Sequence, residues 1–155
     1  MIARISPIAD LLPHTGIAVL LDDVVARTET SLSCSVAIGP DSAFYREEGV
    51  PVHVGLEYMA QTCAAFRGDQ ASRAGESPRP GVILGTRRYF AARAWFARGE
   101  RLVVTAGLVY RDEEVGMFDC VIRSGAEIVA TARLIVAEPK DFAGLLGRQG
   151  GTNDG

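Results

Sequence analysis

The sequence predicts an α+β domain in which an antiparallel sheet wraps around one long central helix. Six segments are rich in β-branched residues or alternate apolar with polar side chains, which is typical of strands. Only one long segment, 54–73, carries apolar residues at helical spacing. Two strands precede this helix and four follow it, an order that does not suit a doubly wound fold in which strands and helices alternate.

The pattern of the N-terminal part of the sequence predicts a short helix followed by a hairpin. Residues 5–12 form an amphipathic segment in which Ser6 can cap a helix and Pro7 suits its first position. Segments 17–27 and 32–38 read as strands joined by a turn.

The central helix is predicted over 54–73, after a loop at 39–51 that Pro40, Gly49 and Pro51 interrupt. The segment contains no proline, and its apolar positions recur at helical spacing: Leu56, Met59, Ala60, Cys63 and Ala64. Because Ala60, Cys63 and Ala64 are small, we expect the sheet to approach this face of the helix closely.

The remaining strands are predicted at 82–90, 101–111, 116–123 and 127–137, after a loop at 75–81. If this sheet curls around the helix, the architecture is a hot-dog fold. Edge-to-edge pairing of two sheets in a dimer would then protect the exposed edge strands. We assign 1–140 to the hot-dog domain and expect 141–155 to form a flexible tail, because 144–155 contains five glycines.

Composition excludes several classes of protein. The length of 155 residues fits one domain, and the net charge of −3 argues against a nucleic-acid binder. No apolar run reaches the roughly 20 residues that span a bilayer, so we expect a cytoplasmic protein without membrane contact. Cys34, Cys63 and Cys120 lie in apolar stretches and are expected to be buried thiols. The sequence requires no metal or cofactor.

Three segments resemble the 3-hydroxyacyl-(acyl carrier protein) dehydratases of fatty-acid synthesis, and more closely their relatives in aryl-polyene biosynthesis. These are LPHTGIAVLLDDV at 12–24, GLEYMAQT at 55–62 and LGTRRY at 84–89. The resemblance implies a hot-dog dimer that binds a thioester through phosphopantetheine and eliminates water. It also implies a catalytic histidine paired with an acid on the central helix, and Glu57 falls on that acidic position.

The position of the histidine departs from the family pattern. The classical family places it in a Gly-His-Phe-Pro loop ahead of the helix, whereas 42–49 of this sequence contains no histidine. His53 lies four residues before Glu57, so the two side chains share one face if the first helical turn includes both. His53 could instead cap the helix or face solvent. His14, in a loop after Pro13, is the alternative base.

Dehydration requires a base for the C2 proton, an acid for the departing hydroxyl and a donor for the thioester carbonyl. We assign His53 as the base and Glu57 as the acid, whose pKa we expect partial desolvation to raise. Free backbone N–H groups near Val54 and Gly55 are expected to hold the carbonyl. Glu57 could alternatively be an ordinary first-turn acid favoured by the helix dipole.

An arginine-rich stretch lies between Arg79 and Arg101. It holds six arginines against the single acid Glu100, a local charge of +5, which leaves −8 for the rest of the chain. Acyl carrier proteins are acidic and deliver a phosphate-bearing arm, so Arg87 and Arg88 are candidate substrate-binding residues. The alternative is a set of solvated strand and loop positions.

The sequence therefore predicts a hydro-lyase that dehydrates a 3-hydroxyacyl group bound to an acyl carrier protein or to coenzyme A. One alternative is an acyl thioesterase in which Glu57 activates water. The other is a non-catalytic hot-dog subunit that binds a carrier protein or a partner chain. The assembly is expected to be a homodimer or a heteromer with another hot-dog chain.

Overall fold

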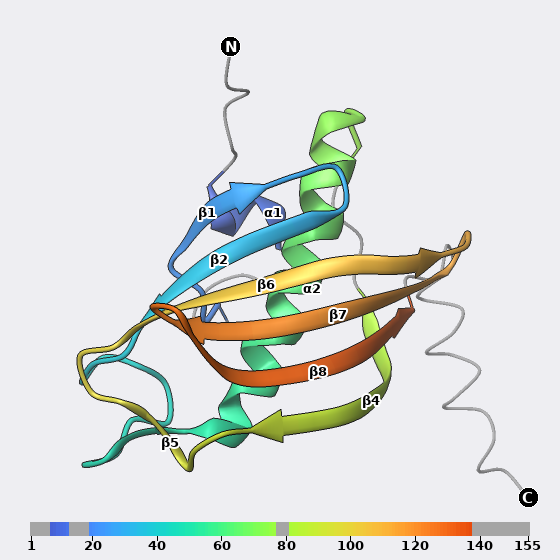
Figure 1. Ribbon diagram of the computed structural model, residues 1–155. Helices are drawn as coiled ribbons and strands as arrows, with labels where there is room; N and C mark the ends of the chain where they lie inside the picture. Colours follow the sequence, from blue (N-terminus) through green and yellow to red (C-terminus); the bar gives the residue numbers. More distant parts are fainter. Residues whose placement is uncertain (1–6, 13–18, 77–80, 138–155) are drawn as a thin grey trace, which may run out of the picture.

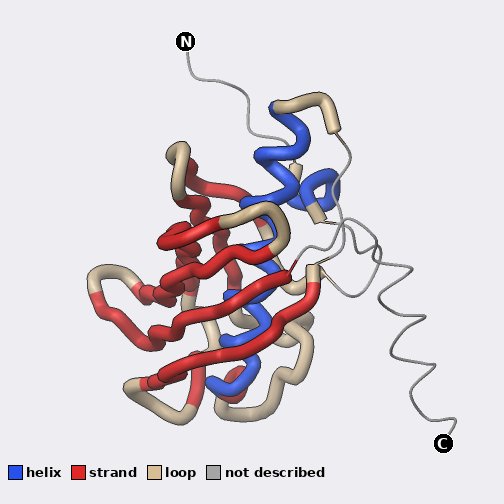
Figure 2. The backbone as a smooth tube through the Cα atoms, turned by 90° about the vertical axis from the view of Figure 1, so that its right-hand side faces the viewer, coloured by secondary structure: helices blue, strands red, loops and turns tan. Residues whose placement is uncertain are grey.

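The computed structural model describes residues 7–12, 19–76 and 81–137 of the chain (Figure 1). Within these ranges one long helix, α2 (Gly55–Arg73), lies along the inner face of an antiparallel sheet that curves around it (Figures 1 and 2). The predicted fold class is therefore confirmed. The predicted tail at 141–155 and His14 lie outside the described residues.

The main sheet has six strands in the order β1-β2-β6-β7-β8-β4, and every neighbouring pair is antiparallel. The strand bounds are β1 Asp23–Arg27, β2 Ser31–Ala37, β4 Val82–Ala91, β6 Arg101–Arg111, β7 Val115–Ser124 and β8 Glu127–Ala137. The predicted strands are confirmed except for the first, which begins at Asp23 rather than at residue 17. Leu20 lies ahead of β1, and its N–H donates to the side-chain oxygen of Gln61 on α2 (2.8 Å) instead of to a strand.

The segment predicted as a loop at 39–51 ends in a short strand. β3 (Gly49–Pro51) pairs with β5 (Trp95–Ala97) in a second, two-stranded sheet. Val50 lies opposite Phe96, and both side chains are fully buried. Strands of three residues are too short to show an alternating pattern, so the sequence did not predict them.

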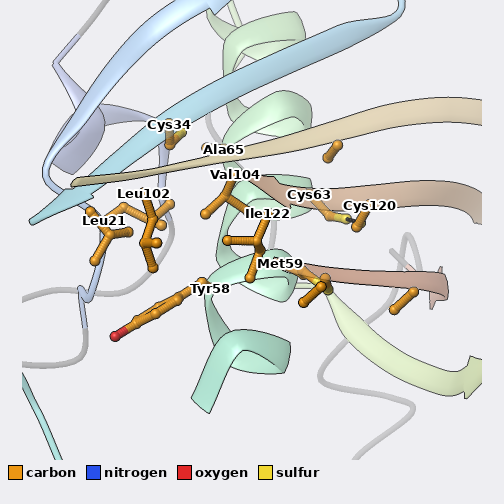
Figure 3. Packing of buried hydrophobic residues seen from close by; sticks show 14 of the residues in the cluster. Leu21, Cys34, Tyr58, Met59, Cys63, Ala65, Leu102, Val104, Cys120 and Ile122 are labelled. Carbon is orange, nitrogen blue, oxygen red and sulfur yellow. Dashed lines mark hydrogen bonds between the residues drawn. The ribbon is translucent and has the colours of Figure 1, made fainter. Parts of the chain in front are cut away.

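The core surrounds α2 on more than one side. Met59 and Cys63 face Val104, Ile122 and Cys120 of the main sheet (Figure 3). Of the predicted small-residue face, Cys63 is buried, but Ala60 and Ala64 are only half-buried. Ala64 nevertheless packs against the core, and burial extends beyond the predicted face. The buried positions of α2 are Gly55, Tyr58, Met59, Gln61, Thr62, Cys63, Ala65, Phe66, Gly68 and Asp69.

The short helix α1 (Ile8–Leu11) packs on α2 at a glycine. A Cβ atom at Gly68 would lie 1.8 Å from the carbonyl oxygen of Leu11, so only glycine permits this contact between the two backbones. The predicted N-terminal helix is confirmed for its described part, although Pro7 occupies the N-cap and Ser6 lies outside the described residues.

The three cysteines are buried and free, as the sequence predicted. The sulfur atoms of Cys63 and Cys120 lie 3.6 Å apart between α2 and β7. Burial raises the pKa of the Cys34 thiol to about 12, so this group stays protonated at neutral pH. Among the described helices, none is long and apolar enough to cross a membrane.

A buried ion-pair cluster ties the first hairpin to the central helix. Asp69 on α2 is 2% exposed and lies 2.8 Å from Arg27 at the end of β1. Its second carboxylate oxygen lies 3.0 Å from Arg73, one turn further along α2. A buried carboxylate of this kind needs such partners, because desolvation of an unpaired charge costs several kcal/mol.

A second cluster fixes the turn between β5 and β6. Glu100 accepts hydrogen bonds from Arg93 (2.8 Å between Nη2 and Oε2), from the Ser124 hydroxyl and from the Ala97 N–H. Burial disfavours the charged carboxylate, but these hydrogen bonds and the charge of Arg93 outweigh it and lower the pKa of Glu100 to about 2.

This cluster predicts a pH-dependent contribution to stability. Because the pKa of Glu100 is lower in the folded chain than its ordinary value of 4.5, its contribution is present above that value and is lost as the pH falls towards 2. We expect Glu100→Gln to reduce the free energy of unfolding by about 2 kcal/mol at neutral pH. Denaturant unfolding should show the gap to wild type shrinking below about pH 4.5. A gap that stays constant down to the acid limit would contradict this role.

Candidate active site at the start of the central helix

The helix begins through a tight turn. The 3-10 helix η2 (Val52–Val54) follows β3 and leads directly into α2. The Gly55 N–H donates to the carbonyl oxygens of Val52 and His53. The prediction that this N–H is free for a thioester carbonyl is therefore wrong, since the 3-10 turn already uses it. Val54 places its side chain in the core.

Gly55 has a packing role instead. A Cβ atom at this position would lie 2.7 Å from the Tyr89 hydroxyl oxygen and 2.9 Å from the Phe96 ring. The Tyr89 hydroxyl donates to the carbonyl oxygen of Val52, so this residue joins β4 to the turn that precedes α2. Glycine at position 55 thus allows the sheet to close over the start of the helix.

Glu57 lies in the first turn of α2 and is exposed. The expectation that it is partly desolvated is wrong for the single chain. Its Oε1 atom accepts a hydrogen bond from the side-chain amide of Gln61 (3.2 Å). Gln61 is buried and uses its own oxygen to hold the N–H of Leu20. Gln61 therefore orients the carboxylate and fixes the segment ahead of β1 beside it.

His53 lies in η2 and is exposed. Its side chain makes no hydrogen bond or ion pair with another described residue, Glu57 included. The structure therefore places both predicted catalytic groups at the solvent-facing start of the helix, without a direct bond between them. Their roles stay predictions.

A hollow of about 660 Å³ opens beside this end of α2. Its walls are the segment ahead of β1 and the segment that runs from the end of β2 into the following loop, and Tyr58 of α2 lies between them. The lining residues are Val19, Leu20, Asp22, Val36, Ala37, Ile38, Gly39, Pro40, Asp41, Ser42, Ala43 and Tyr58. Gln61 bonds both Leu20, on the wall of this hollow, and the Glu57 carboxylate, so it links the two.

The predicted arginine cluster separates into different environments. Arg87 and Arg88 are exposed on the edge strand β4. Arg87 lies opposite Arg133, which pairs with Asp119 on the outer face of the sheet, so Arg87 points away from α2. Arg93 is committed to Glu100 and has a structural role.

Arg88 has a backbone φ of 56°, a left-handed conformation that is uncommon for a residue with a side chain. It lies where the register between β4 and β8 shifts. This irregularity directly precedes Tyr89, whose hydroxyl reaches the Val52 carbonyl. Edge strand β4 also exposes Leu84 and Phe90, which are 60% and 65% exposed.

A curved antiparallel sheet that wraps around one central helix defines a hot-dog protein. Residues 6–147 match the family described as ApeP-like, ApeP dehydratase. The chain therefore belongs to the ApeP-like family and is a dehydratase-like hot-dog protein.

Solved structures agree with this assignment. The chain is similar to the dehydratase heterocomplex ApeI:P from Xenorhabdus doucetiae, with a TM-score of 0.86 and 26% identity over 93% of this chain and 97% of that chain. A hypothetical thioesterase with coenzyme A from Streptococcus pneumoniae TIGR4 shares the fold, with a TM-score of 0.61 and 9% identity over 76% and 84% of the two chains. No curated protein matches the chain.

Proposed function

We propose that this chain eliminates water from a 3-hydroxyacyl thioester carried by an acyl carrier protein, with coenzyme A as the alternative carrier. The observation that supports this most directly is Glu57, which Gln61 orients at the start of α2 in a chain of the dehydratase family. The position matches the acid of the family motif.

In the proposed reaction His53 removes the proton from C2 of the acyl group. The C2–H electron pair forms the C2–C3 double bond as the C3–O bond breaks. Glu57 donates a proton to the departing hydroxyl, which leaves as water, and an enoyl thioester remains. Transfer of the C2 proton from His53 to the Glu57 carboxylate, through solvent, restores both groups.

The exposed catalytic groups and the exposed edge strand β4 support assembly with a second hot-dog chain. His53 and Glu57 are both open to solvent in the single chain, whereas acid–base catalysis is favoured by exclusion of water. The edge strand β4, with Leu84 and Phe90 exposed, offers unpaired backbone groups to another edge strand. The related structure from Xenorhabdus doucetiae is described as a heterocomplex. We propose that a partner hot-dog chain pairs with β4, either as a second copy or as a different chain.

Carrier recognition is assigned to Arg87 and Arg88. Both are exposed, and the neighbouring Tyr89 connects their strand to the start of α2. Opposite charges on an acidic carrier protein would favour docking here. The cytoplasmic location stays a prediction.

The identity of the product tests the proposed reaction. The full chain, alone and together with a partner hot-dog chain, is incubated with a 3-hydroxyacyl thioester on an acyl carrier protein. Mass spectrometry that finds the acyl group still attached and lighter by one water supports dehydration. Free carrier thiol with released 3-hydroxy acid would assign a thioesterase instead. No turnover by a stable heteromer in which the partner's own active site has been removed would assign this chain as a non-catalytic subunit.

A further inference from the structure

We propose that Tyr89 is a positioning residue for the reaction: its hydroxyl holds the turn that carries His53, and a bulge in the edge strand β4 aims that hydroxyl at the turn. The proposal rests on the proposed function, because it takes His53 as the base. It gives a role to the last residue of the LGTRRY segment, which no step of the proposed reaction uses.

His53 has no side-chain partner that could place it. Its imidazole is exposed and makes no hydrogen bond or ion pair with another described residue. The position of the base therefore depends on the backbone of η2, which is three residues long. A 3-10 turn has poorer hydrogen-bond geometry than an α-helix, so a turn this short needs support from neighbouring elements.

Tyr89 supports the peptide group that joins Val52 to His53. The Val52 carbonyl oxygen accepts a hydrogen bond from the Tyr89 hydroxyl and another from the Gly55 N–H. The Val52 N–H donates to the carbonyl oxygen of Ala94 (3.1 Å). Because a peptide group is planar, donors that fix its oxygen also fix the nitrogen of the next residue, here His53.

The Tyr89 side chain is suited to this role. It is half-buried and packs against the core, and burial raises the pKa of Tyr89 to about 12. The hydroxyl therefore keeps its proton at neutral pH and can donate. Its close approach depends on glycine at position 55, because a Cβ atom there would lie 2.7 Å from the hydroxyl oxygen.

A bulge in β4 directs Tyr89 towards the helix. From Arg87 to Phe90, β4 advances by three residues while β8 advances by two. Arg88 lies within this extra step, and its backbone φ is 56°. Arg87 points away from α2, so regular alternation would send Tyr89 away as well. The bulge reverses the alternation, and bulges commonly re-aim a side chain in this way next to active sites.

The kinetic test compares Tyr89→Phe with a matched variant. Phenylalanine keeps the ring and removes only the hydroxyl. In the natural assembly, we expect kcat for a 3-hydroxyacyl-pantetheine thioester to fall about threefold to tenfold, with KM within about twofold of wild type. Ser33→Ala is the control, because it removes the hydrogen bond between the Ser33 and Thr105 hydroxyls (2.7 Å) that joins β2 to β6. It should lower the thermal midpoint by a similar amount but keep wild-type kcat.

A second measurement does not depend on turnover. The chain contains two histidines, so an untagged chain labelled with nitrogen-15 in histidine alone gives two backbone amide signals. His53→Ala identifies the signal of position 53. This amide belongs to the peptide group whose oxygen accepts from Tyr89, so Tyr89→Phe should shift its signal. Ser33→Ala should leave the signal in place.

The proposal is overturned if Tyr89→Phe keeps wild-type kcat, or if only KM rises, since a residue that binds the substrate would give that pattern. It is also overturned if the His53 amide signal does not move, because the hydroxyl would then not hold this peptide group. The proposed function fails separately. If the wild-type assembly forms no enoyl product, the reaction is contradicted, and the amide signal still decides whether Tyr89 holds the turn.

Discussion

Glu57→Gln is expected to lower kcat/KM for dehydration of a 3-hydroxyacyl thioester by about 100- to 10,000-fold, the usual contribution of a general acid. Glutamine keeps the shape of the side chain and an oxygen that can accept the Gln61 hydrogen bond, but it has no carboxylic proton to donate. Because Glu57 is exposed, the substitution should leave the thermal midpoint within a degree or two of wild type. Steady-state kinetics and a thermal melt on the same protein separate the two effects.

His53→Ala tests the assignment of His53 as the catalytic base. If His53 is the base, its loss should reduce kcat/KM by a similar factor, and the double variant should be little worse than either single one, because acid and base act as a unit. Glu76→Gln, an exposed glutamate after the far end of α2, is the matched control and should keep full activity. Wild-type rates in both Glu57→Gln and His53→Ala would show that the site assignment is wrong.

The largest effect on stability is expected at Asp69. Asp69→Asn keeps the shape of the side chain but removes the charge that Arg27 and Arg73 share. Arg27 is only 13% exposed, so it would be left without a counter-charge in a poorly solvated position. Breaking a buried pair in this way costs about 3 kcal/mol. Denaturant unfolding followed by circular dichroism should show the midpoint fall by the corresponding amount.

An exposed ion pair between β7 and β8 of the main sheet provides the comparison for the buried Asp69 cluster. Asp119 and Arg133 are 54% and 42% exposed and lie 2.7 Å apart. Solvent screens such a pair, so Asp119→Asn should change the free energy of unfolding by less than about 1 kcal/mol. If the two variants are equally destabilised, burial of Asp69 does not determine the energetics of its cluster.

The fold could be predicted because its main elements carry long repeating patterns. Segment 54–73 contains no proline and has helical spacing, and the structure places α2 over Gly55–Arg73. The long strands β6 and β8 begin and end where the alternation predicted. The short strands β3 and β5 depend on each other's backbone rather than on a local pattern, and Leu20 is held by Gln61 of α2, so these features could not be predicted locally.

The candidate site was predictable only in part. Glu57 could be found because it lies within a motif that resembles the dehydratases. The role of Gly55 could not, because Phe96 and Tyr89 reach it from distant parts of the chain. The hollow was also missed, because segments that are separate in the sequence form its walls. Only the folded chain places Tyr58 on the wall of this hollow.

The number of arginines in a segment does not show which of their side chains are free to bind a partner. Arg93 is bound by Glu100, and Arg87 faces away from α2. The sequence could not distinguish these environments, since both depend on which residue lies across the strand or turn. Charge reversal at Arg88 therefore tests carrier docking more cleanly than reversal at Arg93, which would disturb the β5–β6 turn.

The account's central claim is that the start of α2 receives the thioester. A crystal structure of the natural assembly with a stable 3-hydroxyacyl-pantetheine amide tests it most directly. We predict the 3-hydroxyl within hydrogen-bond reach of the Glu57 carboxylate, about 2.6–3.2 Å, and the acyl chain in the hollow lined by Tyr58. An ordered ligand whose 3-hydroxyl lies far from Glu57, with its chain outside the hollow, would contradict the account.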